Sequence, residues 1–432
     1  MNPVDLPMAG GARSGVGVYS AVPRGKGTAQ MSLTSSARHA TSQSVARLAC
    51  LWVSLEIVAC SSGANEISGR SPGPSGTANP KVPSIADASR PWTKTLDTGA
   101  DDEIAAMLAA PPSGVYVLGT RSAVAGKSGV LTTLSFEHPV VFSIDASGNT
   151  LWSLEINTSL QYRATGIARG ADGMLAVTAT TLDSQFRRGG LVAFVNDAGS
   201  LVSSFNFPTT QEIDPSAVKI APDGDVVVAG RRQSKPWVSK LSNSGAAAWS
   251  SSGSSTYSGY FADVALSTDG SISILSVDTT KVTDAMPMYA MRLDSTGQQV
   301  LWSQPVGTGY GGVLTLDQDG NLYVAAQGDT GPSSGNVIVK YSADGTELRR
   351  WAATDQEFPQ GIAVLPNGVY VLAGNFGAKK LSQFDPTTAK LLGSLTVSDG
   401  ALAFAMIDAS NAAAGSYQVD DIGLEWLTIP AQ

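Results

Sequence analysis

Acidic side chains lie near the points where several predicted strands begin, and acids are the residues that could supply catalysis here. Two carboxylates separated by about 5 to 9.5 Å can act as a general acid and base, as they do in glycosidases. Sequence alone sets no such separation, so a solvated acidic rim is the alternative interpretation. The acids concerned are Asp101, Asp102, Glu103, Asp214, Asp263 and Glu357.

Histidine, cysteine and metal-binding patterns offer little further chemistry. His138, next to Pro139, is the one histidine in the predicted folded region, where we expect a solvent-facing loop position. The segment from Asp317 to Asn321 resembles the start of a calcium-binding loop, but Gly328 stands where that loop needs a bidentate glutamate. The segment therefore predicts a hairpin turn. We expect no catalytic residue, no metal and no cofactor.

Four aromatic residues share a position in the repeat described below. Tyr260, Tyr310 and Phe358 each lie ten residues before a turn glycine, and Tyr162 lies eleven residues before one. Equivalent positions in a ring of repeats surround one axis. These side chains could therefore line the mouth of a central channel and stack on a sugar or another flat ligand. The alternative is that they wedge between repeats as part of the core.

The elements that would position these residues form an internal repeat of four strands, which we letter a to d. Asp-Gly or Asn-Gly between apolar runs is a strong hairpin signal, because glycine accepts the positive φ of such turns. The b strands are almost continuously apolar, which predicts that both of their faces are covered. The glycines of the a–b turns, 46 to 59 residues apart, are Gly114, Gly173, Gly224, Gly270, Gly320, Gly368 and, more weakly, Gly415.

The c–d turn keeps its own spacing. An Asp, Asn or Ser three residues before glycine suits a type I turn with a glycine bulge. Asp385 holds this place in the sixth copy, which has Thr388 instead of glycine. The other pairs are Asp145/Gly148, Asn196/Gly199, Ser242/Gly245, Asp294/Gly297 and Ser342/Gly345. The tryptophans that follow on the d strand are Trp152, Trp249, Trp302 and Trp351.

Four strands in about 45 to 50 residues are typical of a β-propeller blade, and blades must stack to bury their faces. Residues 90–99 look like a d strand that lacks the three strands before it. Residues 401–432 look like three strands that lack a d strand. Pairing the two segments completes a blade and removes free edges. We therefore predict an all-β, seven-bladed β-propeller, with six or eight blades, or a two-sheet sandwich, as alternatives.

The two ends of the blades differ in their connections. The a–b and c–d turns are short, whereas the b–c and d–a connections, which share one face, look long and irregular. Variable loops on a rigid scaffold are typical of a binding surface. A ligand is expected on this face, near Tyr162, Tyr260, Tyr310, Phe358, Arg187, Arg188, Arg231 and Arg232.

Composition fits an all-β repeat protein and argues against nucleic-acid binding. The chain has 432 residues, 46 of them glycine, and 15% of its residues are charged. Its formal net charge is −8, and residues 1–59 contain five basic residues but two acids, so the remainder is more acidic still. No basic stripe remains to neutralise phosphates.

The first 59 residues predict an export leader. Arg38 and Arg47 precede a mostly apolar run over residues 48–59, which suits a signal peptide and is too short to span a bilayer. The run ends in Ile57-Val58-Ala59-Cys60, which resembles the lipobox of bacterial lipoproteins, although Glu56 departs from that pattern. The resemblance implies that Cys60 is lipidated after cleavage and that Ser61 directs the protein to an outer membrane. The alternative is that residues 48–60 form a buried strand or helix.

These features divide the chain into three parts. Residues 1–59 are the leader, and Met31 is a possible true start that would make residues 1–30 an extension. Residues 60–89 are the lipidated cysteine and a tether rich in Ser, Gly and Pro. Residues 90–432 form the propeller, which contains no cysteine and therefore no disulfide.

The repeat resembles the SBBP-type β-propeller repeats of exported bacterial proteins, especially myxobacterial lipoproteins. It is similar, more loosely, to NHL and quinoprotein-type propellers. The quinoprotein docking motif places Asp four residues before glycine, whereas Asp145 and Asp294 precede Gly148 and Gly297 by three. We therefore expect plain hairpin turns and no pyrroloquinoline quinone.

These resemblances imply a monomeric lipoprotein of the cell envelope that binds a protein or glycan without catalysing a reaction. The SBBP-type repeat carries no family-wide catalytic residues. The alternative is a propeller enzyme, of lyase or glycosidase type, that uses Asp and Glu at the channel mouth.

Overall fold

The computed structural model describes most of the chain beyond residue 91. Contacts divide the chain into two units, residues 1–68 and 69–432, and every described residue lies in the second. The expected leader, Cys60 and Tyr310 lie outside the described residues. The described residues are 92–98, 101–123, 136–157, 160–183, 185, 187–252, 258–280, 286–309, 311–327, 336–352, 358–374, 379–397, 401–418 and 421–429.

The described strands form seven four-stranded antiparallel sheets, which we number as blades in chain order. Blade 1 consists of β2 (Asp101–Ala110), β3 (Gly114–Ala123), β4 (Phe136–Ile144) and β5 (Thr150–Glu155). Blade 2 consists of β6 (Gln161–Arg169), β7 (Leu175–Leu182), β8 (Arg188–Val195) and β9 (Leu201–Phe207). Blade 3 consists of β10 (Ile213–Ile220), β11 (Val226–Arg232), β12 (Lys235–Leu241) and β13 (Ala247–Ser251).

The remaining blades follow the same plan. Blade 4 consists of β14 (Gly259–Leu266), β15 (Ile272–Asp278), β16 (Met286–Leu293) and β17 (Val300–Gly309). Blade 5 consists of β18 (Gly312–Leu316), β19 (Leu322–Gln327), β20 (Asn336–Tyr341) and β21 (Glu347–Ala352). Blade 6 consists of β22 (Phe358–Leu365), β23 (Gly368–Gly374), β24 (Lys379–Phe384) and β25 (Leu391–Val397). Blade 7 consists of β26 (Ala401–Met406), β27 (Asn411–Gln418), β28 (Asp421–Thr428) and β1 (Thr93–Leu96).

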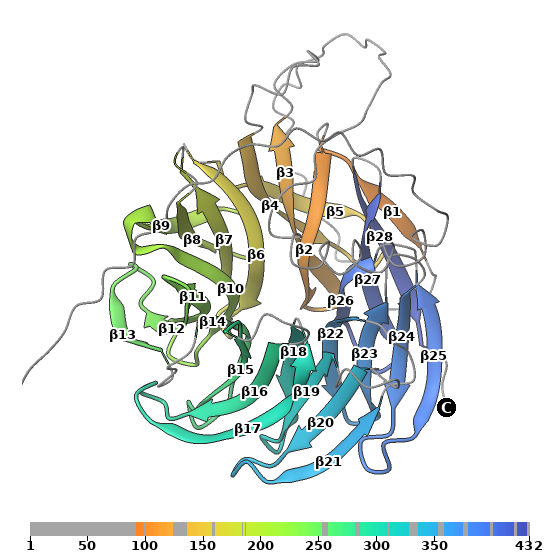
Figure 1. The fold of residues 1–432 in the computed structure, drawn as a ribbon. Coiled ribbons are helices and arrows are strands. Elements are labelled where there is room, and N and C mark those ends of the chain that lie inside the picture. The colour runs from red at the N-terminus through yellow and green to blue at the C-terminus, as the bar shows by residue number, and fades with distance from the viewer. Residues whose placement is uncertain are drawn as a thin grey trace, which may run out of the picture. The chain divides into compact units, whose positions relative to one another are not determined.

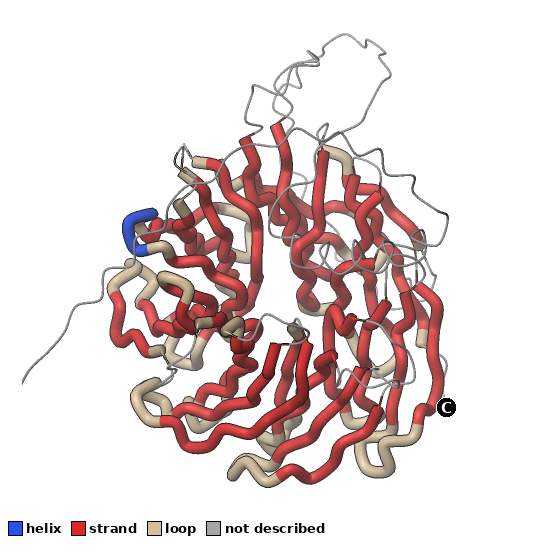
Figure 2. Tube along the Cα trace, viewed as in Figure 1, coloured by secondary structure: helices blue, strands red, loops and turns tan. Residues whose placement is uncertain are grey.

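The blades surround a central axis, with the first strand of each blade innermost (Figure 1). Each inner strand contacts the inner strands of both neighbouring blades, so the ring is closed. Almost all of the described residues are strand or short loop, and one 3-10 helix, η3 (Thr209–Gln211), lies between blades 2 and 3 (Figure 2). The predicted seven-bladed β-propeller is confirmed.

Blade 7 joins the two ends of the described chain. β1 pairs antiparallel with β28, and Thr93 lies opposite Glu425. This is the closure that residues 90–99 predicted. The weak turn assigned to Gly415 is wrong, because Gly415 lies within β27, where a side chain would collide with Ile104 of blade 1. The a–b hairpin turns instead at residues 408–410.

Apolar side chains gather in the seams, by which we mean the interfaces between neighbouring blades. Seven buried clusters occupy the seven seams, and each cluster draws on two blades. The b strands supply fully buried residues such as Val117, Val177 and Val228. Burying one such side chain contributes about 1.5 to 3 kcal/mol. Stacking of blades therefore provides the stability that no single sheet would have.

Indole side chains of the d strands seal several seams. Trp152 of blade 1 packs against Gly199 in the c–d turn of blade 2, and its Nε1 donates to the carbonyl of Asp197 at 2.9 Å. Gly199 has a φ of +77°, which suits glycine, and a Cβ there would lie 2.5 Å from the indole. The predicted c–d turns are thus hairpin turns that also receive the neighbouring blade. Matching indole contacts join Trp302 to Ala343 and Trp92 to Ala146, both at 2.9 Å.

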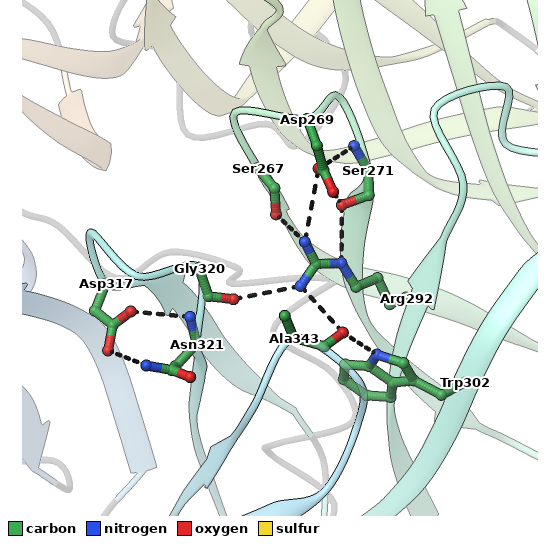
Figure 3. Close-up of polar contacts among 9 residues, drawn as sticks. All are labelled: Ser267, Asp269, Ser271, Arg292, Trp302, Asp317, Gly320, Asn321 and Ala343. Carbon is green, nitrogen blue, oxygen red and sulfur yellow. Dashed lines mark hydrogen bonds and ion pairs between the residues drawn. The ribbon is translucent and has the colours of Figure 1, made fainter.

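Arg292 of blade 4 joins the turns of blades 4 and 5 (Figure 3). This buried guanidinium donates to the hydroxyls of Ser267 and Ser271 at 2.7 and 2.8 Å. It also reaches the carbonyls of Gly320 and Ala343 on blade 5 at 3.3 and 3.4 Å. Buried charge is tolerated where hydrogen bonds surround it, as they do here.

The segment from Asp317 to Asn321 is a turn, as predicted. The Asp317 carboxylate accepts a backbone hydrogen bond from Asn321 at 2.9 Å (Figure 3). It accepts another from the backbone of Asp319 at 3.0 Å. The b–c connection of blade 3, over residues 231–236, contradicts the expectation that the connections on this face are long and irregular. Strands β11 and β12 continue to a two-residue turn at Gln233 and Ser234, both with positive φ, so this connection is a tight hairpin.

Candidate functional site

Side chains at equivalent positions lie near the start of the inner strands, on the face of the b–c and d–a connections, which we call the mouth face. Six inner strands have a register shift near their start, where one residue bulges from the ladder. Bulges of this kind re-aim neighbouring side chains and are common next to functional sites. In blades 1, 2, 3, 4 and 6 we call the residue two positions before the bulge a member of the mouth ring. The members are Glu103, Arg163, Asp214, Tyr260 and Phe358.

Blades 1 to 3 make the charged arc of the mouth ring. Arg163 Nη2 lies 2.5 Å from Glu103 Oε1, which joins blades 2 and 1, and both side chains are about 40% exposed. Asp214 accepts hydrogen bonds from Arg188 Nη1 at 2.6 Å and from Arg231 Nη2 at 2.8 Å. The structure therefore brings together two of the predicted arginines on one of the predicted acids. Opposite charges alternate along this arc.

The other two predicted arginines take different positions. Arg187 pairs with Asp183 on the b–c connection of blade 2, where its Nε donates at 2.7 Å. Backbone and side-chain hydrogen bonds from Arg187 outweigh desolvation and lower the pKa of Asp183 to about 2. Arg232 ends β11 and is exposed.

Blades 4 and 6 place aromatic residues in the mouth ring. Tyr260 is partly buried and packs against the cluster in the seam between blades 4 and 5. Burial raises the pKa of Tyr260, and the nearby Arg231 charge opposes the rise. Phe358 begins β22 and is also partly buried. Tyr260 lies in the blade next to the charged arc, whereas blade 7 separates Phe358 from blade 1.

Tyr162 does not belong to the mouth ring. It is 1% exposed, packs in the seam between blades 1 and 2, and donates its hydroxyl to Asn206 at 2.6 Å. The ring position in blade 2 belongs to Arg163, which sequence reasoning missed. Arg163 lies ten residues before Gly173, the same spacing as Tyr260 before Gly270, so the spacing itself held the signal.

Two further acids near the inner strands are held by hydrogen bonds. Asp102 is 1% exposed and accepts the Thr98 hydroxyl at 2.7 Å. Burial raises the pKa of Asp102, although Thr98 opposes the rise. Asp263 accepts the backbone N–H of Leu314, in the middle of β18, at 2.9 Å and thereby joins the inner strands of blades 4 and 5. Burial raises the pKa of Asp263 as well, against the opposing charge of Lys219.

His138 takes a position that the sequence did not predict. It lies in β4 opposite Arg121 and is 8% exposed, so the expected solvent-facing loop position is wrong. The adjacent Pro139 pairs in the same strand, and the following residues, 140–144, are strongly apolar. Because this apolar run is buried in β4, His138 just before it lies in the same strand and is buried as well.

The chemistry that this arrangement can perform is recognition of charged and flat groups. Within the described ranges, no group of three or more His, Cys, Asp or Glu side chains could hold a metal ion. The same residues include no helix of the length and apolarity that crossing a bilayer requires. The acids of the mouth ring face cations, which suits an interface with alternating charge.

Solved structures share this architecture. The fold is a β-propeller. The chain is similar to the β-propeller domain of Cps50 (Swd1) from Myceliophteria thermophila, with 11% identity and a TM-score of 0.53 over 78% of this chain and 98% of that one. Hydrazine synthase from Kuenenia stuttgartiensis has 13% identity and a TM-score of 0.55, with coverage of 78% and 98%. The Dos1 propeller has 11% identity and a TM-score of 0.51, with coverage of 80% and 97%.

These likenesses show the fold alone, because the identities are low. No family model matches the chain. No curated protein matches it.

Proposed function

We propose that this propeller is a non-catalytic binding module that holds a protein partner on its mouth face. The observation that carries the proposal is the mouth ring, which sets alternating charges beside partly exposed aromatic rings on a rigid scaffold. Aromatic residues and arginine are enriched in protein interfaces. Alternating charges favour partners of complementary pattern and fix their orientation. A glycan that stacks on Tyr260 and Phe358 is the competing ligand.

The acids of the mouth argue for recognition over acid–base catalysis. Asp214 is shared by two arginines, and Glu103 is paired with Arg163. A carboxylate in such a pair has to break its contacts before it exchanges a proton with a substrate. Binding by the intact ion-pair network requires no such change.

The proposal includes anchorage at the cell envelope through Cys60, on the resemblance to a lipobox and to SBBP-type lipoproteins. Growth with an alkyne-tagged fatty acid should label the full chain and should not label Cys60→Ala. The Cys50→Ala variant is the matched control and should label like the parent. Equal labelling of Cys60→Ala and the parent, or no labelling of either, would show that the anchor is absent.

Photo-crosslinking tests the binding face. We would place a benzophenone amino acid at Lys235, an exposed residue beside the b–c turn of blade 3, or at Pro222, an exposed residue in the a–b turn of that blade. The two sites sit at opposite ends of one sheet. We expect a single protein partner to crosslink from Lys235 and not from Pro222. Equal crosslinking from both sites would exclude the mouth face as the specific surface.

A glycan array separates the competing ligand. If a glycan is the partner, the parent should bind defined glycans, and Tyr260→Ala should remove that binding. A protein crosslink from Lys235 together with an empty array would support the proposal.

A further inference from the structure

The seam between blades 2 and 3 lacks the indole that seals its neighbours. Trp152 and Trp302 donate to the carbonyl two residues before a c–d turn glycine of the next blade. At the seam between blades 2 and 3, the hydroxyl of Ser203 makes this contact, donating to the carbonyl of Asn243 at 3.2 Å. Ser203 replaces the hydrogen bond of the indole, and the smaller ring of Phe205 takes the place of the indole against the turn glycine, Gly245.

A groove of about 280 Å³ opens at this seam. Its volume lies near the lower end of the range for small-molecule sites, which is roughly 300 to 1,000 Å³. Three aromatic side chains form its apolar wall, with Phe207 edge-on to Trp237 at 5.4 Å and Phe205 edge-on to Phe207 at 5.6 Å between ring centroids. The polar residues of the lining are Asn206, Gln211, Arg232, Ser239, Ser244 and Ser250.

The polar groups of the groove favour a ligand that accepts hydrogen bonds. Arg232 is the charged residue of the lining, which includes no acid. Trp237 is 5% exposed, and its Nε1 has no acceptor among the described residues. Because that nitrogen has almost no accessible surface, the polar contact of a ligand falls to Arg232.

We propose that this groove binds a small aromatic carboxylate, with its ring against Phe205, Phe207 and Trp237 and its carboxylate toward Arg232. Edge-to-face packing provides a ring site of defined geometry. A guanidinium favours a carboxylate because it offers two parallel donors. The groove lies on the outer part of the seam and uses none of the mouth ring, so the proposal stands apart from partner binding at the mouth.

Calorimetric titration of the full-length protein with indole-3-acetate tests the proposal. The parent should show saturable binding, and Ala247→Trp should weaken it at least tenfold, about the effect of losing one good contact. Ala247 is an exposed residue of the groove lining on the edge strand β13, so an indole there fills the groove without entering the core. Leu348→Trp, which adds an indole at a position on β21 that is 50% exposed, should bind like the parent.

Arg232→Gln tests the charge. Its affinity for indole-3-acetate should fall about tenfold, whereas the uncharged indole-3-acetamide should bind parent and variant alike. Parent-like binding by Ala247→Trp, or the absence of saturable binding in the parent, would overturn the site. Unchanged affinity of Arg232→Gln for the acid would overturn the carboxylate assignment.

Discussion

Arg292 on blade 4 donates its Nη1 hydrogen to the backbone carbonyl of Gly320 on blade 5, 3.3 Å away. The same side chain binds two serine hydroxyls of its own blade. One buried cation therefore fixes the a–b turns of two blades relative to each other. The mouth face lies at the other end of these sheets, so this contact supports the site from a distance.

Arg292→Met should lower the free energy of unfolding by about 2 to 4 kcal/mol, because hydrogen bonds to a charged group are lost while the cost of desolvating the cation is recovered. Arg187→Met is the matched control. In its ion pair with Asp183 the Arg187 side chain is 45% exposed, so the loss of this pair should cost much less than the loss of Arg292. Urea denaturation of both variants makes the comparison. Equal losses would show that Arg292 contributes no more than a surface pair.

Gly199→Ala should destabilise the propeller more than Gly224→Ala. Both glycines have a positive φ, +77° and +86°, which costs an alanine about 1 to 2 kcal/mol. A Cβ at Gly224 would meet nothing within 4 Å, whereas a Cβ at Gly199 would collide with Trp152. Overpacking adds about 1 to 3 kcal/mol, so Gly199→Ala should lose that much more. Equal Tm values for the two variants would contradict the docking of Trp152.

Asp263→Asn should gain stability relative to the parent as the pH rises. Burial lifts the pKa of Asp263 above its ordinary value of 3.8, so the unfolded chain loses this proton at a lower pH than the folded chain. The stability of the parent therefore falls as pH rises through and above 3.8, and the asparagine variant lacks this loss. Urea melts at several values between pH 3 and 7 would measure the difference. The raised pKa would be contradicted if the difference in unfolding free energy between variant and parent did not change with pH, or if it came to favour the parent as the pH rises.

Deletion of residues 92–98 should abolish cooperative unfolding or cause aggregation. The deletion removes β1, leaves the edge of β28 unpaired, and removes Lys94, whose Nζ donates to Gly148 of blade 1 at 2.6 Å. A synthetic peptide of residues 90–99 should restore a cooperative transition, whereas a scrambled peptide should not. A deletion variant as stable as the parent would argue against closure of the ring.

Most of the fold could be predicted because the turns of each repeat require a positive φ, and glycine recurs at those positions. Glycines with positive φ, such as Gly173 and Gly270, mark turns that few other residues tolerate. Blade 7 was harder, because its a–b turn at residues 408–410 has no Asp-Gly pair and Gly415 falls inside a strand. The tight turn at Gln233 and Ser234 was missed because neither residue is a typical choice for positive φ.

The candidate site was less accessible to prediction, because its members differ in chemistry from blade to blade. Arg163 and Asp214 share with Tyr260 the spacing of ten residues before the turn glycine, whereas Glu103 lies eleven residues before Gly114 and is matched to them by the bulge of its strand. In blade 2 the expected aromatic residue, Tyr162, lies one residue before the ring position that Arg163 holds. Pairing of Asp214 with Arg188 and Arg231 depends on side chains from two blades, which no spacing along the chain encodes.

The pairing of β1 with β28 also orders events during synthesis. β1 is the first of the described strands to leave the ribosome, and its partner is the last. Until β28 is made, blades 1 and 6 each present an apolar face that only blade 7 covers. A chain that crossed a membrane while being made would complete its ring only after β28 had crossed. This topology is therefore compatible with export in an unfolded state and folding on the far side.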